Sequence, residues 1–419
     1  MPPPYLKNMN PDLFEQMSDG SWAISRKGSE LILEYYYGPT QYLLMYPFLL
    51  FSKTRSDVEI GLAIFYYSII ILSSILLYIF LFKKFNKFYF LIFYIILFNW
   101  SSMYDCLYQK NIEIFEAFLI ILSLYTIKTK WAKLKTIGTP LTLILAALCK
   151  IKTIIFLPYY LIKNNYKLSF YFIIILIMAI LLTHFTININ KITIFNSYKT
   201  YSDSNGFLTS PTESTLKAGI VRLFAADIDL FKKTSPGNTP EVKLNKNKTK
   251  IALKTYNIIF LLFISLYFIL FLINRQNWDY IDIEYALIII AMVVFSPHSM
   301  NYYYFLLIIP NLIALKLLIT KQFSCFYKIK RWILVMIYLV STLLLTYGGV
   351  PPSLWKKVLP INYSIQEFYI LANLDIYGGL LLFIVLLTYY IHLSSLKSNI
   401  FYKKILQYKN KLTDFLAGA

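Results

Sequence analysis

The chain has 419 residues, of which 58% are hydrophobic and 15% charged. Its mean hydropathy of +0.57 is too high for a soluble domain of this length. Apolar runs recur along nearly the whole chain, whereas a transmembrane β-barrel would show short alternating segments. The composition therefore predicts an all-α polytopic membrane protein.

The formal net charge is +20, and much of it lies in lysine-rich segments between apolar runs. Positive-inside bias produces this pattern in cytoplasmic loops. We therefore expect membrane lipids, and no nucleic acid, as partners. The three cysteines lie far apart, so they predict neither a disulfide framework nor a metal site.

The N-terminal segment 1–57 has no clear spanning helix and no signal peptide. Its polar, acid-bearing part cannot lie in lipid, so it is expected to line an aqueous face of the helix bundle. Each membrane segment takes the chain to the other side of the membrane. With the later lysine-rich loops in the cytoplasm, the N-terminal segment lies outside the cell, although no helix precedes it. Either it is translocated unaided or, as we expect, the chain as given lacks a first span.

The first clear span is 58–82, and the lysines that follow it are placed in the cytoplasm. Counting this span, the later apolar segments and the two arms of the hairpin described below gives about eleven membrane segments. The expected regions are an external N-terminal loop at 1–57, membrane segments at 58–185, an external polar loop at 186–250, membrane segments at 251–395 and a basic cytoplasmic tail at 396–419.

One membrane region, 137–162, is expected to be a broken hairpin. Its two apolar arms, 137–148 and 153–162, are each too short to cross a core of about 30 Å at about 1.5 Å per residue. Lys150 and Lys152 lie between the arms, and both outer flanks are basic. A hairpin with both ends in the cytoplasm keeps every later basic loop inside. Lysines placed between membrane segments are costly, which makes them functional candidates.

Asp12-Leu13-Phe14 is followed by Tyr37-Gly38-Pro39 and by an apolar run that Pro47 breaks. This pattern resembles the first external loop of glycosyltransferase family 87. That family belongs to the GT-C superfamily of polyprenyl-phosphate-sugar-dependent enzymes, which includes bacterial α-mannosyltransferases.

Further stretches resemble the same family. Gln109-Lys110-Asn111 is similar to its Gly-Gln-x-Asn, although Tyr108 replaces the Gly. The segment LILAALCKIKTIIFLPYYLI resembles its small-residue helix followed by Lys, with Lys152 the better match. The segment 295–302 resembles its Ser-Pro-x-Ser-Trp-x-His, with Met300 in place of Trp. A fainter similarity covers 211–215, which includes Glu213, with Arg222 downstream.

The resemblance implies a GT-C-type helical bundle in the inner cell membrane, with the active site formed by external loops. It implies inverting transfer of a hexose, with mannose as the expected sugar. The donor would be a polyprenyl-phosphate-linked sugar and the acceptor a lipid or a glycan. The sequence shows no metal cluster, and Asp279-Tyr280-Ile281-Asp282 is too wide for Asp-x-Asp, so neither metal nor cofactor is expected.

The resemblance gives Asp12 the role of general base toward the acceptor hydroxyl. The alternative is that Asp12 caps a helix starting near Leu13. Asp19, beside Gly20, is either a turn residue or the base itself. Tyr37, Gln109, Asn111, Glu213 and Asn301 are further candidate site residues.

A lipid phosphate leaves in this reaction, and cations at that point stabilise the transition state. Lys152, Lys150 and Arg222 are candidates to bind the phosphate, and His298 is a candidate catalytic residue. Each has a structural alternative: the lysines can snorkel, Arg222 can lie on the polar face of an interfacial helix, and a lone histidine is commonly structural.

Two other functions are compatible with the sequence. A lipid-linked oligosaccharide flippase or other transporter would use the lysines to escort a phosphate and would need no external carboxylate. A polysaccharide polymerase or ligase would also face outward, and it would rely on arginines more than on an aspartate near the start.

Overall fold

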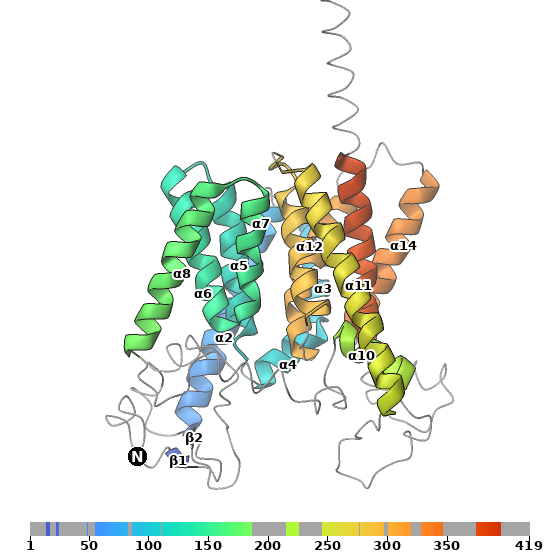
Figure 1. The fold of residues 1–419 in the computed structure, drawn as a ribbon. Coiled ribbons are helices and arrows are strands. Elements are labelled where there is room, and N and C mark those ends of the chain that lie inside the picture. The colour runs from blue at the N-terminus through green and yellow to red at the C-terminus, as the bar shows by residue number, and fades with distance from the viewer. Residues whose placement is uncertain are drawn as a thin grey trace, which may run out of the picture.

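The structure is a computed structural model of the whole chain (Figure 1). The structure describes residues 14–16, 22–24, 48, 55–82, 86–109, 111–186, 215–225, 245–275, 277–296, 301–319, 328–346 and 374–394. In this part of the chain nearly all residues are helical, and strands are limited to β1 (Phe14–Gln16) and β2 (Trp22–Ile24). The expected helical class is therefore confirmed.

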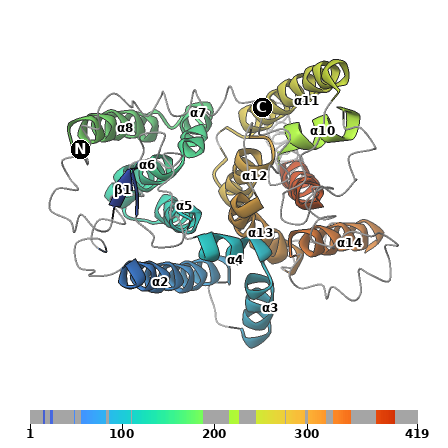
Figure 2. The same ribbon diagram turned by 90° about the horizontal axis from the view of Figure 1, so that it is seen from below.

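Most helices from the first half of the chain lie on one side of the bundle, while the helices at 87–98 and 101–109 lie near its middle (Figures 1 and 2). This half comprises α2 (Arg55–Phe82), α3 (Lys87–Phe98), α4 (Ser101–Gln109), α5 (Glu113–Lys128), the π-helical turn η3 (Leu134–Gly138), α6 (Thr139–Cys149), the 3₁₀ helix η4 (Ile151–Ile155), α7 (Phe156–Ile162) and α8 (Tyr166–Thr186).

The second half supplies the centre and the other side. It comprises α10 (Leu216–Ala225), α11 (Lys246–Ile273), α12 (Ile281–Val294), the 3₁₀ helix η7 (Asn301–Leu307), α13 (Ile308–Ile319), α14 (Lys328–Leu345) and a last helix, Leu374–Ser394. Figure 2 shows α12 and α13 between α5 and the α11–α14 side.

Asparagines define several helix boundaries. The Asn86 side chain accepts hydrogen bonds from the first amides of α3, and Asn245 does the same for α11. These bonds satisfy backbone donors that have no partner inside the helix. Asn99 and Asn274 end the same two helices.

Three helices are long and apolar enough to cross a membrane: Ile60–Phe82, Lys246–Ile273 and Leu374–Ser394. Six further apolar helices in the described residues are shorter. With its 12 residues, α3 is about 18 Å long, less than the hydrocarbon core of about 30 Å. The chain is thus a helical membrane protein, and the count of about eleven segments and the GT-C bundle type stay predictions.

Buried side chains join the two halves around α12, η7 and α13. The indole of Trp100, between α3 and α4, is fully buried and donates to the Tyr304 carbonyl oxygen at 3.0 Å. The added Cβ of an alanine at Gly379 would lie 2.6 Å from Val294 Cγ2. The last helix therefore packs against α12 at a distance that only glycine permits.

The segment from η3 to α7 leaves one end of the bundle and returns to it. Lys135, in η3, and Lys163, which follows α7, lie 5.8 and 5.4 Å from the centroid of the same Trp278 ring. Lys150, midway between them, instead contacts Tyr303 beyond the far end of α12. The compartment that each end faces remains a prediction.

Candidate active site

The site is built around a break between α6 and η4. Lys150 has an extended backbone, with φ −146° and ψ 121°, and its amide still donates to the Ala146 carbonyl at 2.9 Å. The helix therefore ends at Cys149, and the chain restarts as a 3₁₀ helix at Ile151. The break places Lys150 in the interior, where it is only 4% exposed.

Both lysines of this break lie against one aromatic ring. The Lys150 ammonium is 4.3 Å from the centroid of the Tyr303 ring and donates a hydrogen bond to its hydroxyl. The Lys152 ammonium is 4.0 Å from the same centroid, and Lys152 is half-buried. A ring face attracts cations electrostatically, so contact with Tyr303 keeps the ammonium groups of Lys150 and Lys152 close together.

Two glutamates of the first turn of α5 complete the cluster. Glu113 is fully buried, and its Oε1 lies 3.0 Å from the Lys150 ammonium. Glu116 is 1% exposed, and its Oε1 accepts a hydrogen bond from the Thr153 hydroxyl at 2.8 Å. Sequence analysis missed both glutamates, although two acids in the first turn of an apolar helix are a readable signal.

Each of these two carboxylates has a second oxygen, Oε2, that the contacts above do not use. Among the described residues, neither Glu113 Oε2 nor Glu116 Oε2 has a hydrogen-bond partner, and both atoms are buried. A buried acceptor without a donor is costly. The cluster thus offers cations suited to a phosphate and carboxylate oxygens that can accept hydrogen bonds from hydroxyls.

Several other candidate segments lie near this cluster. Gln109 is the last residue of α4, and Asn301 is the first residue of η7. Both α4 and α5 pack against η7. Asn111 is buried just before α5, and its backbone N–H donates to the Cys106 carbonyl at 2.9 Å. The structure therefore brings together Gln109 and Asn111 with the segments 113–116, 150–153 and 301–303.

Arg222 is not brought to this cluster. It is buried on α10, which packs on α11 in a small separate core that contains Ala252 and Tyr256. Figures 1 and 2 show α10 across α12 from α6. The described structure therefore separates Arg222 from Lys150 and Lys152.

Five candidates lie outside the described residues, namely Asp12, Asp19, Tyr37, Glu213 and His298. The described part of the N-terminal segment tests one alternative. Residues Phe14–Gln16 form a strand, in which Phe14 pairs with Ile24 and Gln16 with Trp22. The interpretation of Asp12 as the cap of a helix starting near Leu13 is therefore wrong, because Phe14–Gln16 is a β-strand and not the first turn of a helix.

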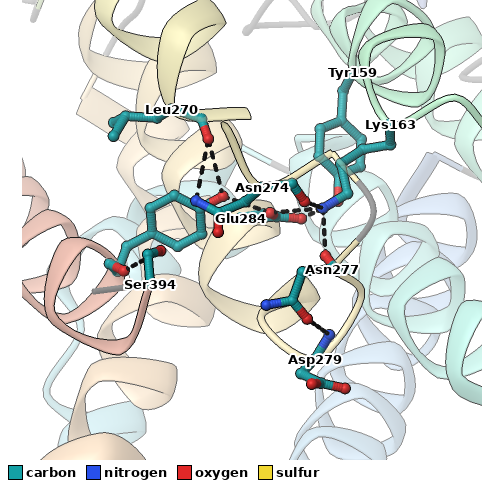
Figure 3. Close-up of polar contacts among 9 residues, drawn as sticks. Tyr159, Lys163, Leu270, Asn274, Asn277, Asp279, Glu284 and Ser394 are labelled. Atoms are coloured by element: carbon teal, nitrogen blue, oxygen red, sulfur yellow. Dashed lines mark hydrogen bonds and ion pairs between the residues drawn. The ribbon is translucent and has the colours of Figure 1, made fainter. Parts of the chain in front are cut away.

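A second buried ion pair lies at the opposite end of α12 (Figure 3). The Lys163 ammonium is 2.9 Å from Glu284 Oε1 and also donates to the Asn274 carbonyl at 2.8 Å. Glu284 accepts two further hydrogen bonds, each 2.6 Å long, from the hydroxyls of Tyr159 and Tyr390. Both carboxylate oxygens have donors, so this cluster is a structural tie between α7, α12 and the last helix.

Among the described residues, no group of three or more His, Cys, Asp and Glu side chains is placed to hold a metal ion.

Comparison with protein families identifies one match, to the model of glycosyltransferase family 87 over residues 35–297. Comparison with curated proteins and with solved structures finds no match. The matched range contains Glu113, Lys150 and Arg222, begins after Asp12 and ends just before His298. It covers more than half of the 419 residues and confirms the resemblance seen in the sequence, so the chain belongs to glycosyltransferase family 87.

Proposed function

We propose that this membrane glycosyltransferase moves a hexose, with mannose as the expected sugar, from a polyprenyl-phosphate donor to a lipid or glycan acceptor. The reaction would take place at the extracytoplasmic face of the inner membrane. One observation carries the proposal: at the break between α6 and η4, the ammonium groups of Lys150 and Lys152 both lie against the Tyr303 ring. Such a pair of cations, with Lys150 buried and Lys152 half-buried, suits a phosphate that lies at the depth of a lipid.

The reaction needs a positive charge beside the departing phosphate. As the bond between the anomeric carbon and the phosphate oxygen breaks, polyprenyl phosphate takes the bonding electrons and gains negative charge. A fixed cation stabilises that charge more in the transition state than in the donor. Lys152 is the more exposed lysine and is assigned the phosphate contact, with Lys150 behind it.

Glu113 is assigned a positioning role. Its carboxylate lies 3.0 Å from the Lys150 ammonium and fixes this charge beside Tyr303. Without that carboxylate the buried ammonium would be uncompensated.

The acceptor hydroxyl attacks the anomeric carbon from the face opposite the phosphate, and its proton passes to a carboxylate. Asp12 is our proposed base, with Asp19 as the alternative. Inversion of the anomeric centre follows from this single displacement.

The test uses the purified protein with a labelled polyprenyl-phosphate hexose and candidate lipid acceptors, and it measures released polyprenyl phosphate. We expect Lys152→Gln to lower the rate by about 10²–10³, the typical effect of removing one preorganised charge-stabilising group. The exposed Lys133 is the matched control, and Lys133→Gln should leave the rate unchanged. Equal rates for all three proteins would contradict the role of Lys152.

The same assay separates the candidate bases and the alternative functions. Asp12→Asn should stop turnover while expression is retained. Turnover that survives Asp12→Asn but not Asp19→Asn would assign the base to Asp19. If no donor reacts while the protein moves lipid-linked sugar between leaflets, the chain is a transporter.

A further inference from the structure

A cavity of about 570 Å³ lies at the end of the bundle opposite the Lys150–Lys152 site. The helix α5 relates the two places, since Glu113 begins it and Lys128, which lines the cavity, ends it. The walls come from α2, α5, α12, α13 and the last helix, and they include Ile79, Ile313 and Leu317. The volume is that of a small-molecule site.

Two lysines of this cavity share one carboxylate. Lys128 forms an ion pair with Asp282 Oδ1, and the Lys316 ammonium lies 3.5 Å from Asp282 Oδ2. Both ammonium groups also face the Phe80 ring, at 4.8 and 5.9 Å from its centroid. Two lysines and one aspartate therefore meet here, and the two lysine side chains are 37% and 24% exposed. An anionic group can therefore reach them from outside.

Asp279 adds a negative charge to the same cavity. It is exposed, and Figure 3 shows its carboxylate turned away from the Lys163–Glu284 pair. The cavity thus combines an apolar wall, two lysines that share Asp282 and an additional carboxylate. This set is complementary to a lipid with one phosphate charge and one ammonium charge.

We propose that this cavity binds a membrane phospholipid whose headgroup carries a phosphodiester and a primary ammonium. The phosphodiester contacts Lys128 and Lys316, the ammonium donates hydrogen bonds to Asp279, and an acyl chain lies along the apolar wall. A primary ammonium has three N–H donors for a carboxylate, whereas a quaternary ammonium has none. The lysine-rich loops at this end predict that the lipid belongs to the cytoplasmic leaflet.

The experiment measures lipid binding to the purified full-length protein by native mass spectrometry. The probes are phosphatidylethanolamine, phosphatidylcholine and phosphatidylglycerol with identical acyl chains. We expect phosphatidylethanolamine to bind about tenfold more tightly than the other two lipids, the effect of one charge-assisted contact. Equal binding of the three lipids, or tightest binding of phosphatidylglycerol, would overturn the proposal.

Variants assign the contacts. Asp279→Asn should remove the preference for phosphatidylethanolamine and should not weaken the binding of phosphatidylglycerol, because it removes a negative charge from the cavity. Lys316→Gln should weaken both lipids, and Lys133→Gln, an exposed lysine outside the cavity, should weaken neither. A preference that persists in both Asp279→Asn and Lys316→Gln would place the lipid elsewhere and refute the assignment.

Discussion

The buried ion pair between Glu113 and Lys150 makes a quantitative prediction about stability. Lys150→Met keeps most of the side-chain volume but removes the charge, which leaves the Glu113 carboxylate buried and uncompensated. The two side chains are 0% and 5% exposed, so solvent cannot replace the lost partner. We expect this variant to be strongly destabilised, and Glu113→Gln in the same chain to restore most of the loss.

The magnitude follows from the geometry. At the observed 3.0 Å, the attraction is about 5.5 kcal/mol for an effective dielectric constant of about 20. Desolvation of the two charges offsets much of this, so the intact pair contributes little net stability. Removing one partner forfeits the attraction but keeps the desolvation cost, which corresponds to a loss of about 3–5 kcal/mol.

The assay is reversible unfolding of the purified protein in detergent, for the two single variants and the double variant. Lys133→Met, at an exposed site, serves as the control and should change the free energy of unfolding by less than about 0.5 kcal/mol. If Lys150→Met costs equally much in the Glu113→Gln background, the two charges are not coupled and the reasoning is refuted.

Two further predictions use the same unfolding assay. Glu284→Gln should cost about 3–5 kcal/mol because it leaves a buried ammonium uncompensated. Tyr390→Phe should cost less, about 1.5–3 kcal/mol, because it removes one hydrogen bond to a charged group. Equal losses would contradict the structural tie. Gly379→Ala places its Cβ 2.6 Å from Val294 Cγ2 and should cost about 1–3 kcal/mol. At Gly219 the nearest atom would be 3.2 Å away, so Gly219→Ala should cost less, and the reverse order would argue against this packing.

The membrane class and the family could be read from the sequence. Composition and apolar runs suffice for the class because a chain this hydrophobic can fold only in lipid or against it. Lys150 and Lys152 stood out for the same reason, since a charge between two apolar segments needs an explanation. The family followed from short motifs whose residues the structure now places partly together, at Asn111 and in the break after Cys149.

Only the tertiary structure decided which side chains meet. The sequence singled out Arg222 as a third phosphate-binding residue beside the two lysines, but Arg222 lies on α10, which packs on α11. The charged side chain that contacts Lys150 is Glu113. The pair between Lys163 and Glu284 was equally hidden, because its members are 121 positions apart in the sequence. Membrane helices are apolar on the face toward lipid and on the face toward protein, so hydrophobic periodicity does not tell which faces touch. The partners of a buried charge are therefore settled by helix packing.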